Sequence, residues 1–130
     1  MPNPFAFEQN ITFLHTSDLQ ATAHFYEQVL GLKLARDQGL CLIYHASPSG
    51  LIGFCKHMKT GDPQGVILTL VCDDVDGWYE KLRAKGVEFI KTPAHNPKFD
   101  IYNCFFKDPN GYLVEIQRFD QPLSRDEASQ

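Results

Sequence analysis

The residues that could do chemistry in this 130-residue chain are a few polar side chains set within apolar, β-branched segments. Among them, Glu115 follows Leu113 and Val114 near the C-terminal end. A carboxylate in apolar surroundings can act as a general base, or can anchor a cationic or hydroxyl-bearing ligand. We expect it to need a hydrogen-bonding partner such as His15 or Tyr44. The alternative is a structural glutamate that is only hydrogen-bonded to a neighbour.

The other candidate ligating residues show no recognised spacing. No chelating pattern joins the remaining histidines, which we interpret as surface residues: His24, His45, His57 and His95, the last in a predicted loop that could overhang a pocket. The cysteines are separated by 14, 17 and 32 residues: Cys41, Cys55, Cys72 and Cys104. Zinc clusters usually need closer ligand pairs, so we predict reduced cysteines that serve as small core or strand residues.

The composition excludes several classes of protein. Hydrophobic residues make up 43% of the chain and charged residues 22%, which is typical of a globular domain. The net charge of −4 leaves no basic excess for a phosphate backbone, so we expect no nucleic-acid partner. We find neither a run of about 18 apolar residues nor a basic, apolar signal segment at the N-terminus. We therefore expect a cytoplasmic protein without a membrane partner.

The elements that must position these side chains occur twice along the chain. In the first half, the pattern predicts a strand at 9–16, a helix from Asp18 to Gly31, and strands at 32–36, 40–46 and 51–55. In the second half, it predicts a strand at 66–72, a helix from Asp74 to Gly86, and strands at 87–90, 102–107 and 112–119. Residues 56–65 read as a linker, and 93–97 as a loop.

This repeat predicts the fold class. The distance from helix cap to glycine is 13 residues in the first half and 12 in the second, and the turns at 47–50 and 108–111 are offset by 61. We predict one α+β domain over residues 1–130, made of two tandem βαβββ modules at about 9–57 and 64–119, with a tail at 120–130. The modules should form one cupped mixed sheet with both helices on its convex face.

Two motifs resemble the vicinal oxygen chelate superfamily, the group of glyoxalases, bleomycin-resistance proteins, fosfomycin-resistance enzymes and extradiol dioxygenases. One is the opening Ser-Asp-Leu at 17–19 with Phe-Tyr-Glu at 25–27 and Leu-Gly-Leu at 30–32. The other is the closing Asp-Pro-Asn-Gly-Tyr-Leu-Val-Glu at 108–115. The resemblance covers about residues 9–119. It implies a homodimer and, in the enzymes, a divalent metal in the cup that the substrate chelates.

The metal positions that the resemblance implies are only partly filled. Glu115 occupies the position in the closing strand, whereas Ile11 and Ile67 occupy the positions in the two opening strands. An isoleucine has no lone pair for a metal, and one carboxylate is not a site. We therefore expect no metal cofactor, unless the register is shifted and Gln9 or His15 substitutes as a ligand.

Side-chain alternation gives the expected lining of the cup. If Glu115 points inward, so do its neighbours two residues away and their cross-strand partners. The ligand-binding candidates are Phe13, His15, Tyr44, Phe54, Thr69, Asn103, Phe105 and Gln117. The remaining positions of this expected lining are Leu42, Ile52, Ile67, Val71 and Leu113. The surface is apolar and aromatic with a few polar points, which is typical of a small-molecule pocket.

The expected function is that of a glyoxalase/bleomycin-resistance-like protein, which binds or transforms a small aromatic molecule. We expect the molecule to be neutral, because no lysine or arginine is predicted beside Glu115. One alternative is a metal-dependent lyase or dioxygenase of the same superfamily. A second alternative is a structural or regulatory dimer in which the aromatic side chains fill the cup as core.

Overall fold

The computed structural model describes residues 5–57 and 62–123. The first module contains, in order, β1 (Asn10–His15), α1 (Leu19–Ala23), a π-helical continuation η1 (His24–Val29), β2 (Lys33–Asp37), β3 (Cys41–His45) and β4 (Gly50–Cys55). The second contains a short 3₁₀ turn η2 (Pro63–Gly65), β5 (Ile67–Val71), α2 (Val75–Ala84), β6 (Phe89–Asn96), β7 (Ile101–Lys107) and β8 (Leu113–Phe119). The predicted elements all occur, and β6 replaces part of the predicted loop at 93–97.

Three predicted segments fall partly outside the described residues. They are the start of the N-terminal lead-in at 1–4, the middle of the linker at 58–61, and the end of the tail at 124–130. In the described part of the chain, no helix combines the length and the apolar character needed to cross a membrane.

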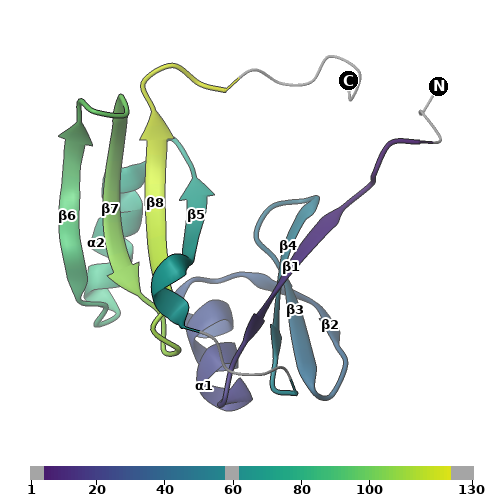
Figure 1. Cartoon of the computed structure of the whole chain (residues 1–130). Helices are drawn as coiled ribbons and strands as arrows, with labels where there is room; N and C mark the ends of the chain where they lie inside the picture. Colours follow the sequence, from purple (N-terminus) through teal and green to yellow (C-terminus); the bar gives the residue numbers. More distant parts are fainter. Residues whose placement is uncertain (1–4, 58–61, 124–130) are drawn as a thin grey trace.

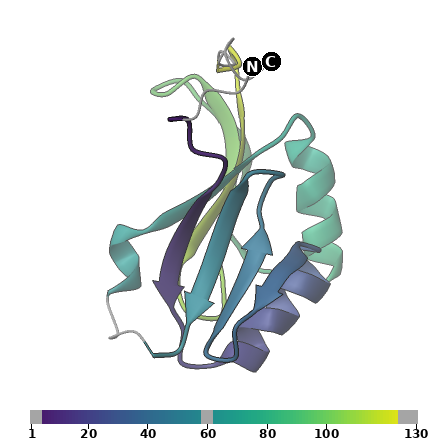
Figure 2. The same cartoon turned by 90° about the vertical axis from the view of Figure 1, so that its right-hand side faces the viewer.

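Each module forms its own four-stranded mixed sheet. The first sheet has the order β1-β4-β3-β2 and the second has the order β5-β8-β7-β6. In both, the opening strand pairs in parallel with the last strand of the module, and the other neighbours are antiparallel. Figure 1 shows α1 between the two sheets and α2 behind the second sheet; Figure 2 shows the first sheet broad-on.

The α+β class with two tandem βαβββ modules is confirmed. The expectation of one continuous sheet is wrong, because β1 pairs with β4 and β5 pairs with β8, so the two opening strands lie in separate sheets. The broad faces that are turned away from the helices also point in different directions. The face of the second sheet is turned toward the viewer in Figure 1, and the face of the first sheet in Figure 2. We call these surfaces the first and second open faces.

The helix boundaries follow the predicted capping residues. The Asp18 side chain accepts a hydrogen bond from the backbone N–H of Ala21 at 3.0 Å, and Asp74 accepts one from Gly77 at 2.9 Å. Such caps satisfy N–H groups that have no partner inside the helix. After each helix, Gly31 and Gly86 adopt φ values of +79° and +91°, which only glycine adopts without strain.

A buried carboxylate joins the two modules. The hydroxyl of Tyr26, on η1, donates a hydrogen bond to Asp108 at 2.7 Å. The same carboxylate accepts the backbone N–H groups of Asn110 and Tyr112 at 2.9 and 2.8 Å. Around this contact, the Phe25 ring of the first module lies 6.1 Å from the Phe106 ring of the second. The apolar core therefore continues from one module into the other.

The turn that carries Asp108 is held to the first module a second time. The Asn110 side chain accepts a hydrogen bond from Thr16 at 2.7 Å and donates one to Thr22 at 3.1 Å. The Tyr112 hydroxyl donates to the backbone carbonyl of His15 at 2.8 Å. These contacts connect the Asp-Pro-Asn-Gly turn directly to the junction between β1 and α1, and so fix how the two sheets lie relative to each other.

Burial perturbs both partners of the central contact. Loss of solvent raises the pKa of Tyr26, and the neighbouring carboxylate raises it further. Burial also raises the pKa of Asp108, against the opposing effect of the hydrogen bonds that it accepts. Because the folded-state pKa lies above the ordinary 3.8, the folded protein holds this proton more tightly than the unfolded chain. The stability that Asp108 contributes is therefore present below pH 3.8 and is lost as the pH rises through the folded-state pKa.

We expect Tyr26→Phe to lower the free energy of unfolding by about 1–3 kcal/mol, because a buried carboxylate loses a hydrogen bond. The substitution should also raise the pKa of Asp108 further, since the lost hydrogen bond favoured the charged form. Denaturant unfolding and a carboxyl NMR titration measure the two effects. The matched control is Tyr44→Phe, which removes a hydroxyl bonded to Glu27 within one module and should leave the pKa of Asp108 unchanged. An unchanged pKa in Tyr26→Phe would contradict the assignment.

Candidate functional site

Four side chains form a row across the second open face. The backbone register pairs Lys91 of β6 with Phe105 of β7, Phe105 with Glu115 of β8, and Glu115 with Thr69 of β5. Directly paired residues on neighbouring strands point to the same side of a sheet. Val114 and Ile116, on either side of Glu115, belong to the core, so this row faces away from α2.

A hydrogen-bonded network holds the row in place. One oxygen of Glu115 accepts the Thr69 hydroxyl at 2.8 Å, and the other accepts the Asn103 amide at 2.7 Å. The ammonium group of Lys91 donates to both the side-chain and the backbone oxygen of Asn103. Asn103 thus bridges a cation and a carboxylate. The expectation that His15 or Tyr44 is the partner of Glu115 is wrong. Thr69 and Asn103 take that role.

Lys91 is the residue that the sequence analysis missed. The prediction that no cation lies beside Glu115 is wrong, because β6 extends to Asn96 and brings Lys91 onto the same row. The predicted strand ended at 90, whereas β6 continues through Lys91 to Asn96. Lys91 and Glu115 give the row one charge of each sign. Phe105 lies on β7, between β6, which carries Lys91, and β8, which carries Glu115.

The remaining candidates of the second module also lie on this face. Gln117 pairs with Asn103 in the next row, and its side chain is buried. Ile67 and Val71 flank Thr69 on β5 and are 54% and 59% exposed. The second open face therefore combines an apolar border with the polar row that the prediction placed around Glu115.

The first open face carries apolar, aromatic and polar side chains. Phe13 of β1 is 41% exposed and its ring lies directly over Gly53 of β4. A groove of about 360 Å³ runs along this face and is lined by residues of β1 to β4, among them Ile11, Ile43 and Arg36. A wider groove of about 760 Å³ lies between η1 and the start of β6, and it includes none of the residues of the polar row.

The predicted pocket role of Tyr44 and Phe54 is wrong. Both side chains are fully buried in the core, where the Tyr26 ring lies 4.5 Å from Phe54 and 6.1 Å from Tyr44. The physical reason is a slip of one residue. The strand registers align Gly53, not Phe54, with Glu115, an offset of 62 where the matching turns indicated 61. Shifting a strand by one residue moves every side chain to the opposite face.

The same slip misplaced Leu42 and Ile52, which are core residues as well. His15 is also separated from Glu115, since it lies at the end of β1 in the other sheet. Its two ring nitrogens are buried without a hydrogen-bond partner among the described residues. His15 lines a polar groove of about 420 Å³ next to Ser17, Asp18 and the 109–112 turn.

The cysteine prediction is wrong for two of the four residues. Cys41 and Cys55 are direct partners on β3 and β4 and are joined by a disulfide. Cys104 is a free, buried thiol, and burial raises its pKa to about 11. Cys72 is free and partly buried. Antiparallel pairing thus brings together two cysteines that are 14 residues apart, which sequence spacing alone did not reveal.

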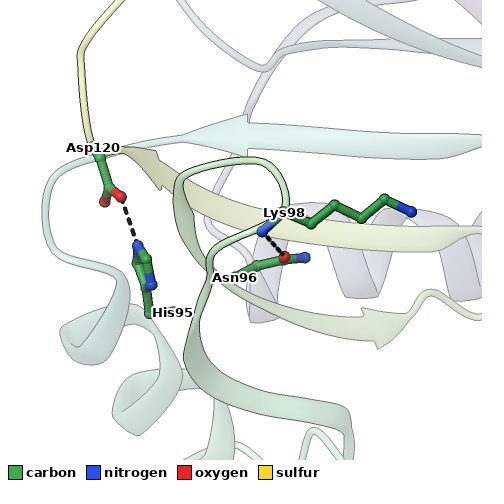
Figure 3. Close-up of polar contacts among 4 residues, drawn as sticks. All are labelled: His95, Asn96, Lys98 and Asp120. Carbon is green, nitrogen blue, oxygen red and sulfur yellow. Dashed lines mark hydrogen bonds and ion pairs between the residues drawn. The ribbon is translucent and has the colours of Figure 1, made fainter.

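His95 lies in β6 rather than in a loop. Its ring lies 2.6 Å from the Asp120 carboxylate, and the neighbouring Asn96 side chain accepts the backbone N–H of Lys98 at 3.0 Å (Figure 3). His95 pairs with Tyr102, whose hydroxyl bonds to Asp76 on α2. His95 therefore lies on the helix side of the second sheet, away from Glu115.

The donors around Glu115 do not fit a catalytic divalent metal. Both carboxylate oxygens accept hydrogen bonds, from Thr69 and Asn103. The positions that the superfamily enzymes use for further ligands hold the hydrocarbon side chains of Ile11 and Ile67, both exposed on the open faces. Within residues 5–57 and 62–123, Glu115 belongs to no group of three clustered His, Cys, Asp or Glu side chains. We derive no step through a metal at this position.

Paired βαβββ modules with open sheet faces define a class of small proteins built by internal repetition. Residues 9–116 match the profile of the Glyoxalase/Bleomycin resistance protein/Dioxygenase superfamily. The chain belongs to this superfamily, and the resemblance indicated by its motifs is confirmed.

Individual relatives share most of the domain. The chain is 25% identical over 119 residues to the uncharacterized protein YraH of Bacillus subtilis (strain 168), covering 81% of this chain and 93% of the relative. A glyoxalase/bleomycin resistance protein/dioxygenase from Nocardioides superposes with a TM-score of 0.75 at 20% identity, covering 97% and 91% of the two chains. TnmS3, an antibiotic binding protein from Streptomyces sp. CB03234, gives 0.76 at 22% identity, covering 89% and 98%. At these identities, the two structures establish the fold.

We expect Gly53→Ala to displace the Phe13 ring, because the added Cβ would lie 2.4 Å from a ring carbon. Overpacking costs about 1–3 kcal/mol, and the partial exposure of Phe13 should keep the loss of unfolding free energy near the lower end. Denaturant unfolding measures the loss, and NMR contacts between Phe13 and β4 report the ring position. Gly65→Ala is the matched control, since nothing lies near its Cβ position. Retention of the Phe13–β4 contacts in Gly53→Ala would contradict this packing.

Proposed function

We propose that the protein binds a small, neutral, aromatic molecule on the second open face, and that a second copy of the chain covers the bound molecule with its first open face. The observation that carries the proposal is the row formed by Lys91, Phe105, Glu115 and Thr69. The row offers an aromatic surface next to fixed hydrogen-bonding groups, the usual composition of a small-molecule site.

The charges of the row support a neutral ligand. Lys91 and Glu115 carry opposite charges and are bridged by Asn103. A ligand with a full charge would meet one attractive and one repulsive group, whereas a hydroxyl or amide edge can exchange hydrogen bonds with both. An aromatic ring stacked on Phe105 adds about 0.5–1.5 kcal/mol beyond the burial of its area.

The open faces support the second copy. Ile11 and Phe13 are 42% and 41% exposed on the first open face, and Ile67 and Val71 are more exposed on the second. Exposed apolar side chains that gather on one face are typical of an interaction site. Because the two open faces of one chain point in different directions, they cannot cover the same ligand (Figures 1 and 2). The first face of a second copy can supply the missing cover, with Phe13 opposite Phe105.

Binding, rather than a metal-dependent lyase or dioxygenase reaction, is the activity that the donor set supports. Antibiotic binding by the structural relative TnmS3 is in keeping with a binding role on this fold. In this proposal Glu115 orients the ligand through a hydrogen bond, and no metal takes part at that position. A cytoplasmic location remains part of the proposal.

We expect the wild-type protein to bind 2-naphthol and to bind 2-naphthoate more weakly, as measured by ligand-observed NMR. Glu115→Gln should shift the preference toward 2-naphthoate, because Lys91 is then unbalanced, and Lys91→Met should weaken 2-naphthoate binding further. Phe13→Ala and Phe105→Ala should each weaken 2-naphthol binding by about 2- to 12-fold, the equivalent of one lost aromatic contact. Tyr79→Leu on α2, behind the second sheet, is the control and should bind as wild type. Binding of 2-naphthoate alone by the wild type would overturn the assignment.

We expect light scattering at micromolar concentration to give twice the mass of the chain. Val71→Lys should shift the mass toward that of one chain, because it places a charge on the second open face. Leu40→Lys changes an equally exposed leucine, 57% exposed in the β2–β3 turn, and should leave the mass unchanged. A single-chain mass for the wild type would show that the faces are not paired.

A further inference from the structure

A second cluster of ligating side chains lies on the first open face. Cys41 and Cys55 are directly opposed on β3 and β4, with Cα atoms 4.2 Å apart, and His57 follows Cys55 by two residues. The Cys41 sulfur lies 3.6 Å from Nδ1 of His57. One ligand atom from each of the three residues lies within 4.8 Å of the others.

The geometry matches a soft metal site once the sulfurs are thiols. Zinc bound by Cys and His has bonds of about 2.0–2.3 Å, so neighbouring ligand atoms of a tetrahedral site lie about 3.3–3.8 Å apart. The contact between Cys41 and His57 already falls in this range. The two sulfurs need only rotate apart about their side-chain bonds, because the strand pairing keeps their Cα atoms opposed.

The surroundings of the cluster favour metal-bound thiolates over unpaired thiolates. Cys41 and Cys55 are both buried, so two thiolates without a counter-charge would be costly there. His15, the direct partner of Cys55 on β1, adds two buried ring nitrogens that have no partner among the described residues. The cluster therefore joins two potential thiolates to a histidine and borders a second histidine whose hydrogen-bonding capacity is unused.

We propose that, in the reduced protein, Cys41, Cys55 and His57 bind one thiophilic divalent cation such as Zn²⁺, with water in the fourth position. The disulfide is the oxidised, metal-free state of the same site. A dithiol reductant supplies two electrons and two protons to the sulfurs and is itself oxidised to a disulfide. The cation then displaces the two thiol protons. Bound metal and disulfide exclude each other, so the redox state decides occupancy.

Cobalt titration of the full chain tests the proposal. The protein is reduced, freed of reductant without oxygen, and titrated with Co²⁺. We expect one Co²⁺ per chain with a thiolate-to-cobalt charge-transfer band, which Zn²⁺ abolishes. The oxidised protein should show no band. The controls Cys72→Ala/Cys104→Ala, which removes the other two thiols, and Glu115→Gln should both retain it.

The variants at the cluster decide the assignment. Cys55→Ser should lose the two-thiolate band, and His57→Ala should weaken Co²⁺ binding by about 10-fold or more, as expected for a metal ligand. His57 is exposed two residues beyond the end of β4, so this variant remains a valid test even where a cysteine variant fails to fold. Absence of the band in the reduced wild type, or unchanged affinity in His57→Ala, would overturn the proposal.

Discussion

The buried Asp108 carboxylate is the contact on which the rest of the structure depends. Asp108 accepts the backbone N–H groups of Asn110 and Tyr112 from its own turn, and the hydroxyl of Tyr26 from the helix of the other module. A carboxylate removed from water is costly unless its oxygens are satisfied. Both modules must therefore meet in one arrangement to satisfy it, and that arrangement turns the two open faces in different directions.

Much of the fold could be predicted because local chemistry determines it. The aspartate caps, the glycines with positive φ and the strand alternation depend only on neighbouring residues, and the repeat makes each half support the interpretation of the other. The strand register was predicted correctly where a motif fixed it, as it did around Glu115. Asn103, Phe105 and Thr69 follow from that residue by alternation and pairing.

The errors arose where spacing along the chain had to be converted into pairing across strands. The turn motifs of the two β-hairpins are offset by 61 residues, whereas their paired strand residues are offset by 62, and this one-residue difference caused the wrong prediction for Tyr44 and Phe54. The disulfide partners and Lys91 were missed for the same reason, because both depend on which residues oppose each other. Bulges in the β2–β3 and β6–β7 pairs add to this difficulty, since they shift the register within a single ladder.

The π-helical turn η1, at the end of the first helix, limits how far the length of this helix can change. At η1 the Leu30 N–H bonds to the Phe25 carbonyl five residues earlier, so this turn holds one residue more than an α-helical turn. Phe25 and Tyr26 lie within it and make the contacts to Phe106 and Asp108. A deletion of one residue here would restore regular helical spacing but would rotate one of these side chains away from the second module. The segment therefore has the geometry of a single-residue insertion, and a chain without the extra residue would need another way to satisfy the buried aspartate.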